Sequence, residues 1–193
     1  MKIILTTSAA IAAVVAIATP AAAQKVPAAS IAIVDLARVS SECTACKPAA
    51  ATLQSQVTAL RTRQQQLTAS LQGEGTSIQT AITALSGKTP DAALTARIRA
   101  IQTKQEAANQ ELQRGQQQIQ RNQAFIQQQI DAKLGPVIEQ VMQRRGANIV
   151  IEAGTTLRAG GGLDVTTDVL TGLNAALPSL NTTAPAAANP QSR

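Results

Sequence analysis

The sequence predicts an α+β protein in which a long antiparallel coiled-coil hairpin of two helices is attached to a small β-sheet body formed by the two chain ends. Three observations support this prediction. Apolar residues recur with a heptad spacing over two consecutive segments, β-branched residues concentrate near both ends, and aromatic residues make up 1% of the chain. A compact globule of this length normally fills its core with aromatic side chains, so one large core is not expected. A narrow helix–helix seam is expected instead.

The first 23 residues (1–23) are predicted to be a secretory signal peptide. Lys2 precedes an apolar run over 3–18, and Ala21 and Ala23 occupy the small positions of an Ala-X-Ala cleavage site. No Cys follows that site, so a lipid anchor is not indicated, and no later segment approaches membrane-spanning length. The mature chain is expected to begin at Gln24 and to reside in the periplasm of a bacterium.

Composition excludes several classes of function. The chain carries a net charge of +6 and contains no His, so no Ser/His/Asp or Cys/His catalytic set can form and no enzyme is expected. Two Cys without His are too few ligands for a metal, and no phosphate-binding Gly-rich motif is present, so no cofactor is expected. The positive charge favours acidic unfolded polypeptides or anionic lipid, unless it serves only solubility. Nucleic acid is disfavoured by export and by the lack of aromatics for base stacking.

The N-terminal part of the body is predicted over residues 30–47. Ser30–Val39 alternates with β-branched residues and is expected to form one strand. Ile31, Ile33 and Leu36 are expected to face a common core.

Two matched heptad segments predict the helical arm over residues 48–134. The turn signal Ser86–Asp91 separates them, since Gly can end one helix and Pro followed by Asp can begin the next. The heptad positions are Leu53, Val57, Leu60, Leu67, Leu71, Ile78 and Leu85 in the first segment, and Leu94, Ile98, Ile101, Ala108, Leu112, Ile119 and Ile126 in the second.

The predicted seam is weak, so the arm is expected to bend and splay easily. Polar residues or Gly interrupt the heptads, and two further glycines lie within the first leg. The interruptions are Gln64 and Glu74 in the first leg, Gln105, Gly115, Asn122 and Gln129 in the second, and the further glycines are Gly73 and Gly75.

The second part of the body is predicted over residues 135–177. Pro136 predicts a kink or restart of the helix. Strands are expected at Asn148–Glu152 and Thr155–Arg158, followed by a helix with Thr166 as N-cap. Because a stable sheet needs about three strands, the hairpin must return both chain ends to one place. Such a body leaves sheet edges exposed, so self-association is expected.

The last residues, 178–193, are rich in Pro, Ala, Asn and Thr. This composition predicts a disordered tail.

In two stretches the chain resembles the Skp/OmpH family of periplasmic chaperones. Family members begin with a pattern like "IAVVD…RV", matched here by "IAIVDLARV" over 31–39, and end with a Pro-containing helix, a hydrophobic strand after Gly and a helix like "DIT…VL..LN". The matches to that last motif are Asp164, Val165, Thr166, Val169, Leu170, Leu173 and Asn174. The resemblance covers the mature chain over 24–177, and the terminal motif is its most specific part.

The resemblance implies a homotrimer whose hairpins surround a cavity that holds unfolded outer-membrane proteins without ATP. Weak apolar contacts and positive charge near the arm tip would then hold the client. The candidate client-binding residues are Ile78, Ile82, Leu85, Lys88, Leu94, Arg97, Ile98, Arg99 and Ile101. The alternative is that the apolar members of this set form only the seam within the hairpin.

Cys43 and Cys46 depart from the family pattern, which carries small or polar residues at these positions. In the oxidising periplasm they are candidates for a local structural disulfide. A redox-active dithiol, reduced thiols and a link between protomers are the alternatives.

A second class of function is a structural coiled-coil adaptor of an envelope assembly. Hairpins of that kind are normally inserted in larger β-domains, which this chain lacks.

Overall fold

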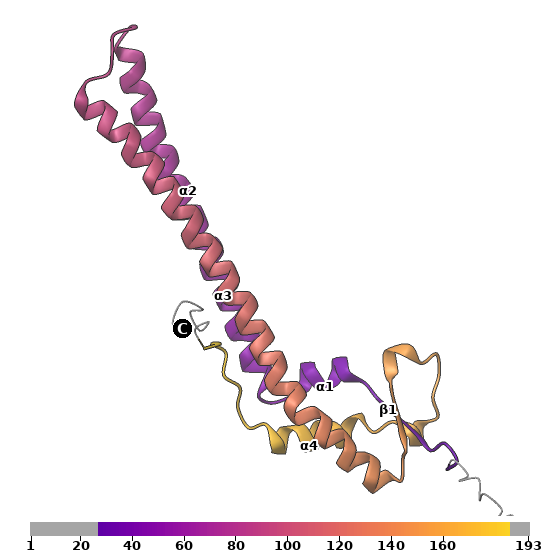
Figure 1. Cartoon of the computed structure of the whole chain (residues 1–193). Helices are drawn as coiled ribbons and strands as arrows, with labels where there is room; N and C mark the ends of the chain where they lie inside the picture. Colours follow the sequence, from indigo (N-terminus) through magenta and orange to yellow (C-terminus); the bar gives the residue numbers. More distant parts are fainter. Residues whose placement is uncertain (1–26, 186–193) are drawn as a thin grey trace, which may run out of the picture.

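The computed structural model describes residues 27–185; the predicted signal peptide, 1–23, and residues 186–193 lie outside the described range. The described chain is mostly helical, with one small sheet and two 3₁₀ turns (Figure 1). Its elements are β1 (Ile31–Val34), α1 (Leu36–Glu42), α2 (Cys46–Ala84), α3 (Ala92–Arg145), β2 (Ile149–Glu152), η1 (Ala153–Thr155), η2 (Gly161–Leu163) and α4 (Thr166–Ala176).

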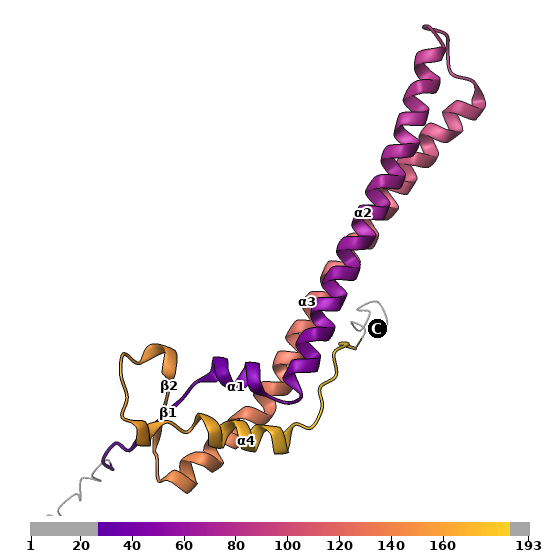
Figure 2. The same ribbon diagram turned by 180° about the vertical axis from the view of Figure 1, so that it is seen from behind.

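Helices α2 and α3 run out from the body and back again, side by side, with the turn between them at the far end (Figures 1 and 2). The 39 residues of α2 correspond to a length of roughly 60 Å. The turn falls where Ser86–Asp91 predicts it, with Ser86 and Gly87 at φ of 50° and 88°. Asp91 caps α3 by accepting a hydrogen bond from the Leu94 N–H at 2.7 Å.

Helix α3 continues through Pro136 without a break, so the predicted restart is wrong. Proline removes one backbone hydrogen bond, but the helix is held by the body on both sides of that point. Val137 and Val141 are 5% and 1% exposed, respectively. The packing of the following turn therefore outweighs the local cost of the proline.

The sheet has two parallel strands instead of three. β1 pairs with β2 in the register Ile31↔Ile149 to Val34↔Glu152, and the Val165 N–H donates to the Ile33 carbonyl at 2.8 Å on the other side. The strand predicted at Thr155–Arg158 is wrong, because the chain turns through η1 directly after β2.

The strand predicted over Ser30–Val39 is shorter than expected because Asp35 ends it. The Asp35 carboxylate accepts a hydrogen bond from the Arg38 N–H at 2.8 Å and so begins α1. Ile33 is buried as predicted, but Ile31 is 39% exposed, and Leu36 is only partly buried. Both faces of the strand are covered at its centre, since Ala32 and Val34 are buried as well.

One hydrophobic core joins the two ends of the chain to the base of the arm. Helix α4 lies against α3 at a close approach, where a Cβ on Gly172 would stand 2.8 Å from Val137. The most deeply buried members are Val34, Val39, Cys43, Val141, Val169 and Leu173.

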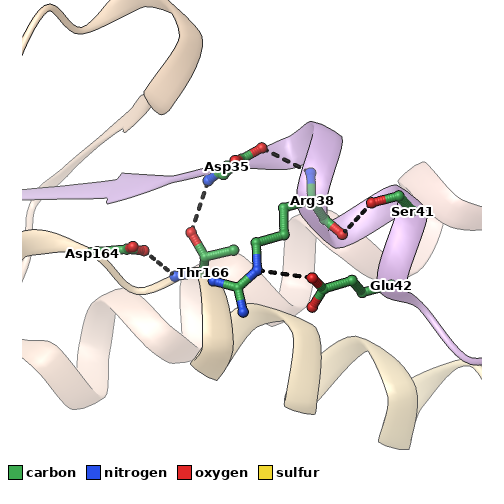
Figure 3. A network of polar contacts seen from close by, with 6 residues as sticks. All are labelled: Asp35, Arg38, Ser41, Glu42, Asp164 and Thr166. Atoms are coloured by element: carbon green, nitrogen blue, oxygen red, sulfur yellow. Dashed lines mark hydrogen bonds and ion pairs between the residues drawn. The ribbon is translucent and has the colours of Figure 1, made fainter.

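A polar network fastens the end of β1 to the start of α4 (Figure 3). The buried Thr166 hydroxyl accepts a hydrogen bond from the Asp35 N–H at 2.9 Å. The Asp164 carboxylate accepts one from the Thr166 N–H at 2.8 Å. The prediction of Thr166 as the N-cap is wrong: Val165 is the N-cap and Thr166 is the first residue of α4, with its N–H bonded to Asp164.

The segment after α4 also differs from its predicted disorder. Leu177 is buried, Leu180 packs against the core, and Asn181 and Ala184 make hydrogen bonds to α3. The tail thus runs back along the arm over 178–185 (Figure 1).

Acid is expected to weaken the junction between β1 and α4 through Asp164. Its hydrogen bonds with Thr166 hold the pKa of Asp164 below the ordinary 3.8. A depressed folded pKa adds stability above pH 3.8, and that stability is lost as the pH falls through the folded pKa. Asp164→Asn should therefore lower the urea midpoint at pH 7, and the gap to wild type should shrink at pH 3. The exposed Glu139→Gln is the control, and an unchanged gap at the two pH values would contradict this assignment.

Candidate functional site

The arm is the candidate functional site because most of its surface faces solvent and it projects away from the core (Figure 2). The apolar candidates near its tip divide by burial. Ile78 and Leu94 are 8% and 7% exposed, and at that distance from the body only the opposite helix can bury them. Leu85, Ile98 and Ile101 are partly buried, whereas Ile82 is 38% exposed. Most of the apolar candidates thus belong to the helix–helix seam, and Ile82 is open to a partner.

The basic candidates lie on the outside of the tip. Lys88, Arg97 and Arg99 are all exposed. Arg97 donates a hydrogen bond to the Ser77 hydroxyl at 2.8 Å across the arm. Together they give the outer end of the arm exposed positive charge.

Polar pairs supplement the apolar seam along the middle of the arm. Arg63 and Glu111 join α2 to α3 at 2.6 Å, and Lys104 and Glu74 do so at 2.5 Å. The hydrogen bond from Arg63 holds the pKa of Glu111 below its ordinary value. Exposed pairs of this kind contribute little to stability, so they set the register of the two helices more than they hold them together.

Gly115, which interrupts the predicted seam, makes room for a neighbour. A Cβ at this position would lie 2.6 Å from the Leu60 side chain, so the glycine lets Leu60 pack directly on the α3 backbone. The seam is therefore thinner here, and the side chains beside it enclose an open groove of about 470 Å³. The groove is lined by Gln56, Ala59, Leu60, Arg63, Gly115, Gln118, Ile119, Asn122 and Thr183.

The predicted candidates do not include this groove or the tail beside it. The sequence did mark Asn122 and Gln129 as polar breaks in the heptad, but gave no sign that they contact the C-terminal segment. Composition alone could not place residues 178–185 on the arm.

A second exposed feature lies on the body. Ile31 and Ile149 are register partners at the start of the two strands, and they are 39% and 41% exposed. Leu163, which precedes the residue bridged to β1, is 41% exposed. Ile31 and Ile149 thus form an exposed apolar pair, and Leu163 is a third exposed apolar side chain of the body; these three residues are named the body patch.

Cys43 and Cys46 form a disulfide at the base of the arm, with their Cα atoms 5.0 Å apart. Cys43 is fully buried and Cys46 is 7% exposed. The Cys46 N–H donates to the Cys43 sulfur at 3.2 Å. Sulfur atoms so enclosed are poorly accessible to an attacking thiolate, so the geometry favours a structural role at the start of α2.

No group of three metal-ligating side chains occurs over residues 27–185. No helix in the same range is long and apolar enough to cross a membrane.

The arrangement defines a class of protein: a small α/β body, closed by both chain ends, that carries a long helical arm. The sequence model of the OmpH-like outer membrane proteins matches residues 30–173. The chain belongs to the OmpH-like family.

A solved structure shares the fold. It is the crystal structure of a protein from Caulobacter crescentus CB15 described as a candidate OmpH-like outer membrane chaperone, which superposes with a TM-score of 0.59 at 21% sequence identity. The similarity covers 81% of this chain and 90% of the other. No curated protein sequence matches significantly.

The different burial of Leu94 and Ile82 gives a test of the seam. Leu94→Ala removes a buried side chain and should destabilise the outer arm by about 2 kcal/mol. Ile82→Ala should cost less, about 1 kcal/mol or below, because the side chain is already partly in water. Hydrogen exchange over residues 78–101 measures both. Equal acceleration of exchange in the two variants would contradict the assignment of Leu94 to the seam.

Proposed function

We propose that the protein is an ATP-independent holdase chaperone of the periplasm that binds unfolded outer-membrane β-barrel proteins and prevents their aggregation. The observation that carries this proposal is the shape of the arm: a long, thinly packed helix pair with an exposed polar surface and a positive tip. Membership of the OmpH-like family and a fold shared with a candidate outer membrane chaperone support it.

The chemistry of the client matches such an arm. An unfolded β-barrel strand alternates apolar and polar side chains and exposes unpaired backbone groups, so it aggregates through its edges. Many weak contacts can shield it and still release it. Ile82 offers one exposed apolar contact at the tip, and Lys88, Arg97 and Arg99 attract acidic segments of the client. Peripheral contact with anionic lipid is a further use of the same charge.

We propose that three copies assemble through their bodies. The three coiled-coil hairpins that project from these bodies would then surround a cavity. The body patch supports this arrangement, because Ile31, Ile149 and Leu163 are large apolar side chains in one small body that a second copy would cover. The parallel sheet also has only two strands in the described chain, and a sheet this small gains stability from further coverage.

Holding of a client is tested by diluting a urea-unfolded outer-membrane β-barrel protein into buffer. The mature protein should suppress light scattering at a near-stoichiometric ratio of trimer to client, with or without ATP. Ile82→Ser combined with Lys88→Gln should raise the amount required about threefold, since it removes an exposed apolar and a cationic contact. Thr83→Ser, also exposed at the tip, serves as control.

Two outcomes of that assay would contradict the proposal. One is undiminished aggregation at tenfold excess of the protein. The other is co-isolation with a pump or pore without any holding activity, which is the behaviour of a structural adaptor.

Assembly through the body is tested by Ile149→Asp. A carboxylate at this exposed position is tolerated by the folded monomer but would be buried without a partner in the interface. The mass from light scattering should therefore fall from trimer to monomer at micromolar concentration. Val57→Asp, at a residue 39% exposed on the arm, should leave the mass unchanged. A trimeric mass for Ile149→Asp would exclude this face of the body as the interface.

A further inference from the structure

The C-terminal tail is recognised on the arm through its backbone. Gln129 donates from Nε2 to the Asn181 carbonyl at 2.9 Å, and its Oε1 accepts from the Asn181 N–H at 3.0 Å. One side-chain amide thus exchanges two hydrogen bonds with one residue, as a neighbouring strand does in a β-ladder. No side chain of the tail takes part in this pair.

A second contact with the tail backbone lies nearer the N-terminal end of α3. The Ala184 N–H donates to Asn122 Oδ1 at 2.8 Å. Asn122 is 3% exposed, and its amide is oriented by two other groups. It donates from Nδ2 to Gln56 of α2 at 2.9 Å, and its Oδ1 also accepts from Gln118 at 2.8 Å. The acceptor is therefore held by two contacts within the arm in addition to the contact with the tail.

The two contacts are spaced for a chain that is neither helical nor part of a sheet. Asn122 and Gln129 are seven residues apart on a helix, which corresponds to about 10 Å at the helical rise. Asn181 and Ala184 are three residues apart, which in extended backbone is at most about 10 Å, and the chain bends at Thr183 between them. The two side chains therefore contact residues i and i+3 of a non-helical chain that runs antiparallel to α3.

Burial along the tail has the matching period of two. Leu180, Thr182 and Ala184 are partly buried, whereas Asn181, Thr183 and Pro185 are exposed. Alternate side chains of an extended chain point to opposite sides, so Leu180 and Thr182 face the arm, and the chain then bends at Thr183. Thr183 forms one edge of the groove over Leu60 and Ile119, which continues the apolar surface beyond the tail.

We propose that Gln129, Asn122 and the adjoining groove form a binding site for the main chain of an extended polypeptide, which the protein's own tail occupies until an unfolded client displaces it. The inference rests on the proposed chaperone function and assigns it a site. Main-chain hydrogen bonds give affinity without sequence selectivity, as in strand addition to a sheet edge. The alternating side chains of an unfolded β-barrel strand suit the period of two. A tethered tail lowers the apparent affinity for the client by the fraction of time the site is covered.

The first test uses a dye-labelled peptide with the sequence of residues 180–185 and fluorescence anisotropy. A mature protein that ends at Leu180 keeps the core contact of that residue and should bind the peptide at least fivefold more tightly than the full mature chain. In the shortened protein, Gln129→Leu should weaken binding at least fivefold, whereas the exposed neighbour Gln128→Leu should not. N-methylation of the peptide nitrogens that correspond to Asn181 and Ala184 should weaken binding to a similar extent. Equal binding by the Gln129 and Gln128 variants, or by the methylated peptide, would overturn the site.

The second test uses the full mature chain and hydrogen exchange. The amides of Asn181 and Ala184 should be protected, and Gln129→Leu should remove that protection. Addition of a urea-unfolded outer-membrane β-barrel protein should remove it as well. Persistent protection while the client is held would refute displacement of the tail and leave the chaperone function standing. Peptide binding through Gln129 by a protein that holds no barrel protein would refute the chaperone function and leave the site standing.

Discussion

The pairing of β1 with β2 is the constraint on which the rest of the structure depends. These strands are separated by more than a hundred residues, and they meet in parallel register from Ile31↔Ile149 to Val34↔Glu152. The intervening chain must therefore travel out and return, and two long helices joined by one tight turn do this. On the other side of β1, the bond from Val165 to Ile33 and the Thr166–Asp35 contact bring in α4. A body closed in this way has one place from which the arm can emerge.

The thin packing of the arm follows from the scarcity of large apolar residues in its sequence. With few large apolar residues, its helices pack through a seam of small and medium side chains, supplemented by the pairs Arg63–Glu111 and Lys104–Glu74. Such a seam keeps two helices in register without a deep core. It also leaves an open groove beside the point where Leu60 packs on Gly115. The scarcity of large apolar residues therefore explains both the thin packing of the arm and the groove beside its seam.

Much of this could be predicted from the sequence, because periodicity is a local signal. The heptads and the Gly–Pro–Asp turn located the helices, and the β-branched segments predicted as strands over 30–39 and 148–152 contain the two strands that meet, β1 and β2. The errors arose where tertiary contacts decide. Asp35 ends β1 and caps α1 within a stretch that alternates like a strand, and the packing of Val137 and Val141 carries α3 through Pro136. The hydrogen bonds of Asn122 could not be predicted from the sequence either. A polar residue at a seam position indicates weak packing. That Asn122 is an oriented acceptor depends on Gln56, Gln118 and the tail, which is distant in sequence.

The closure of the body by both chain ends is tested most directly by distances between spin labels in the mature protein. Labels at the exposed residues Ala37 of α1 and Thr167 of α4 should give a short and narrow distribution. Labels at Ala37 and Lys88 should give a distance of roughly 60 Å, the length of the arm. A broad, long distribution between Ala37 and Thr167, or a short distance to Lys88, would contradict a body assembled from the two ends of the chain with the arm projecting from it.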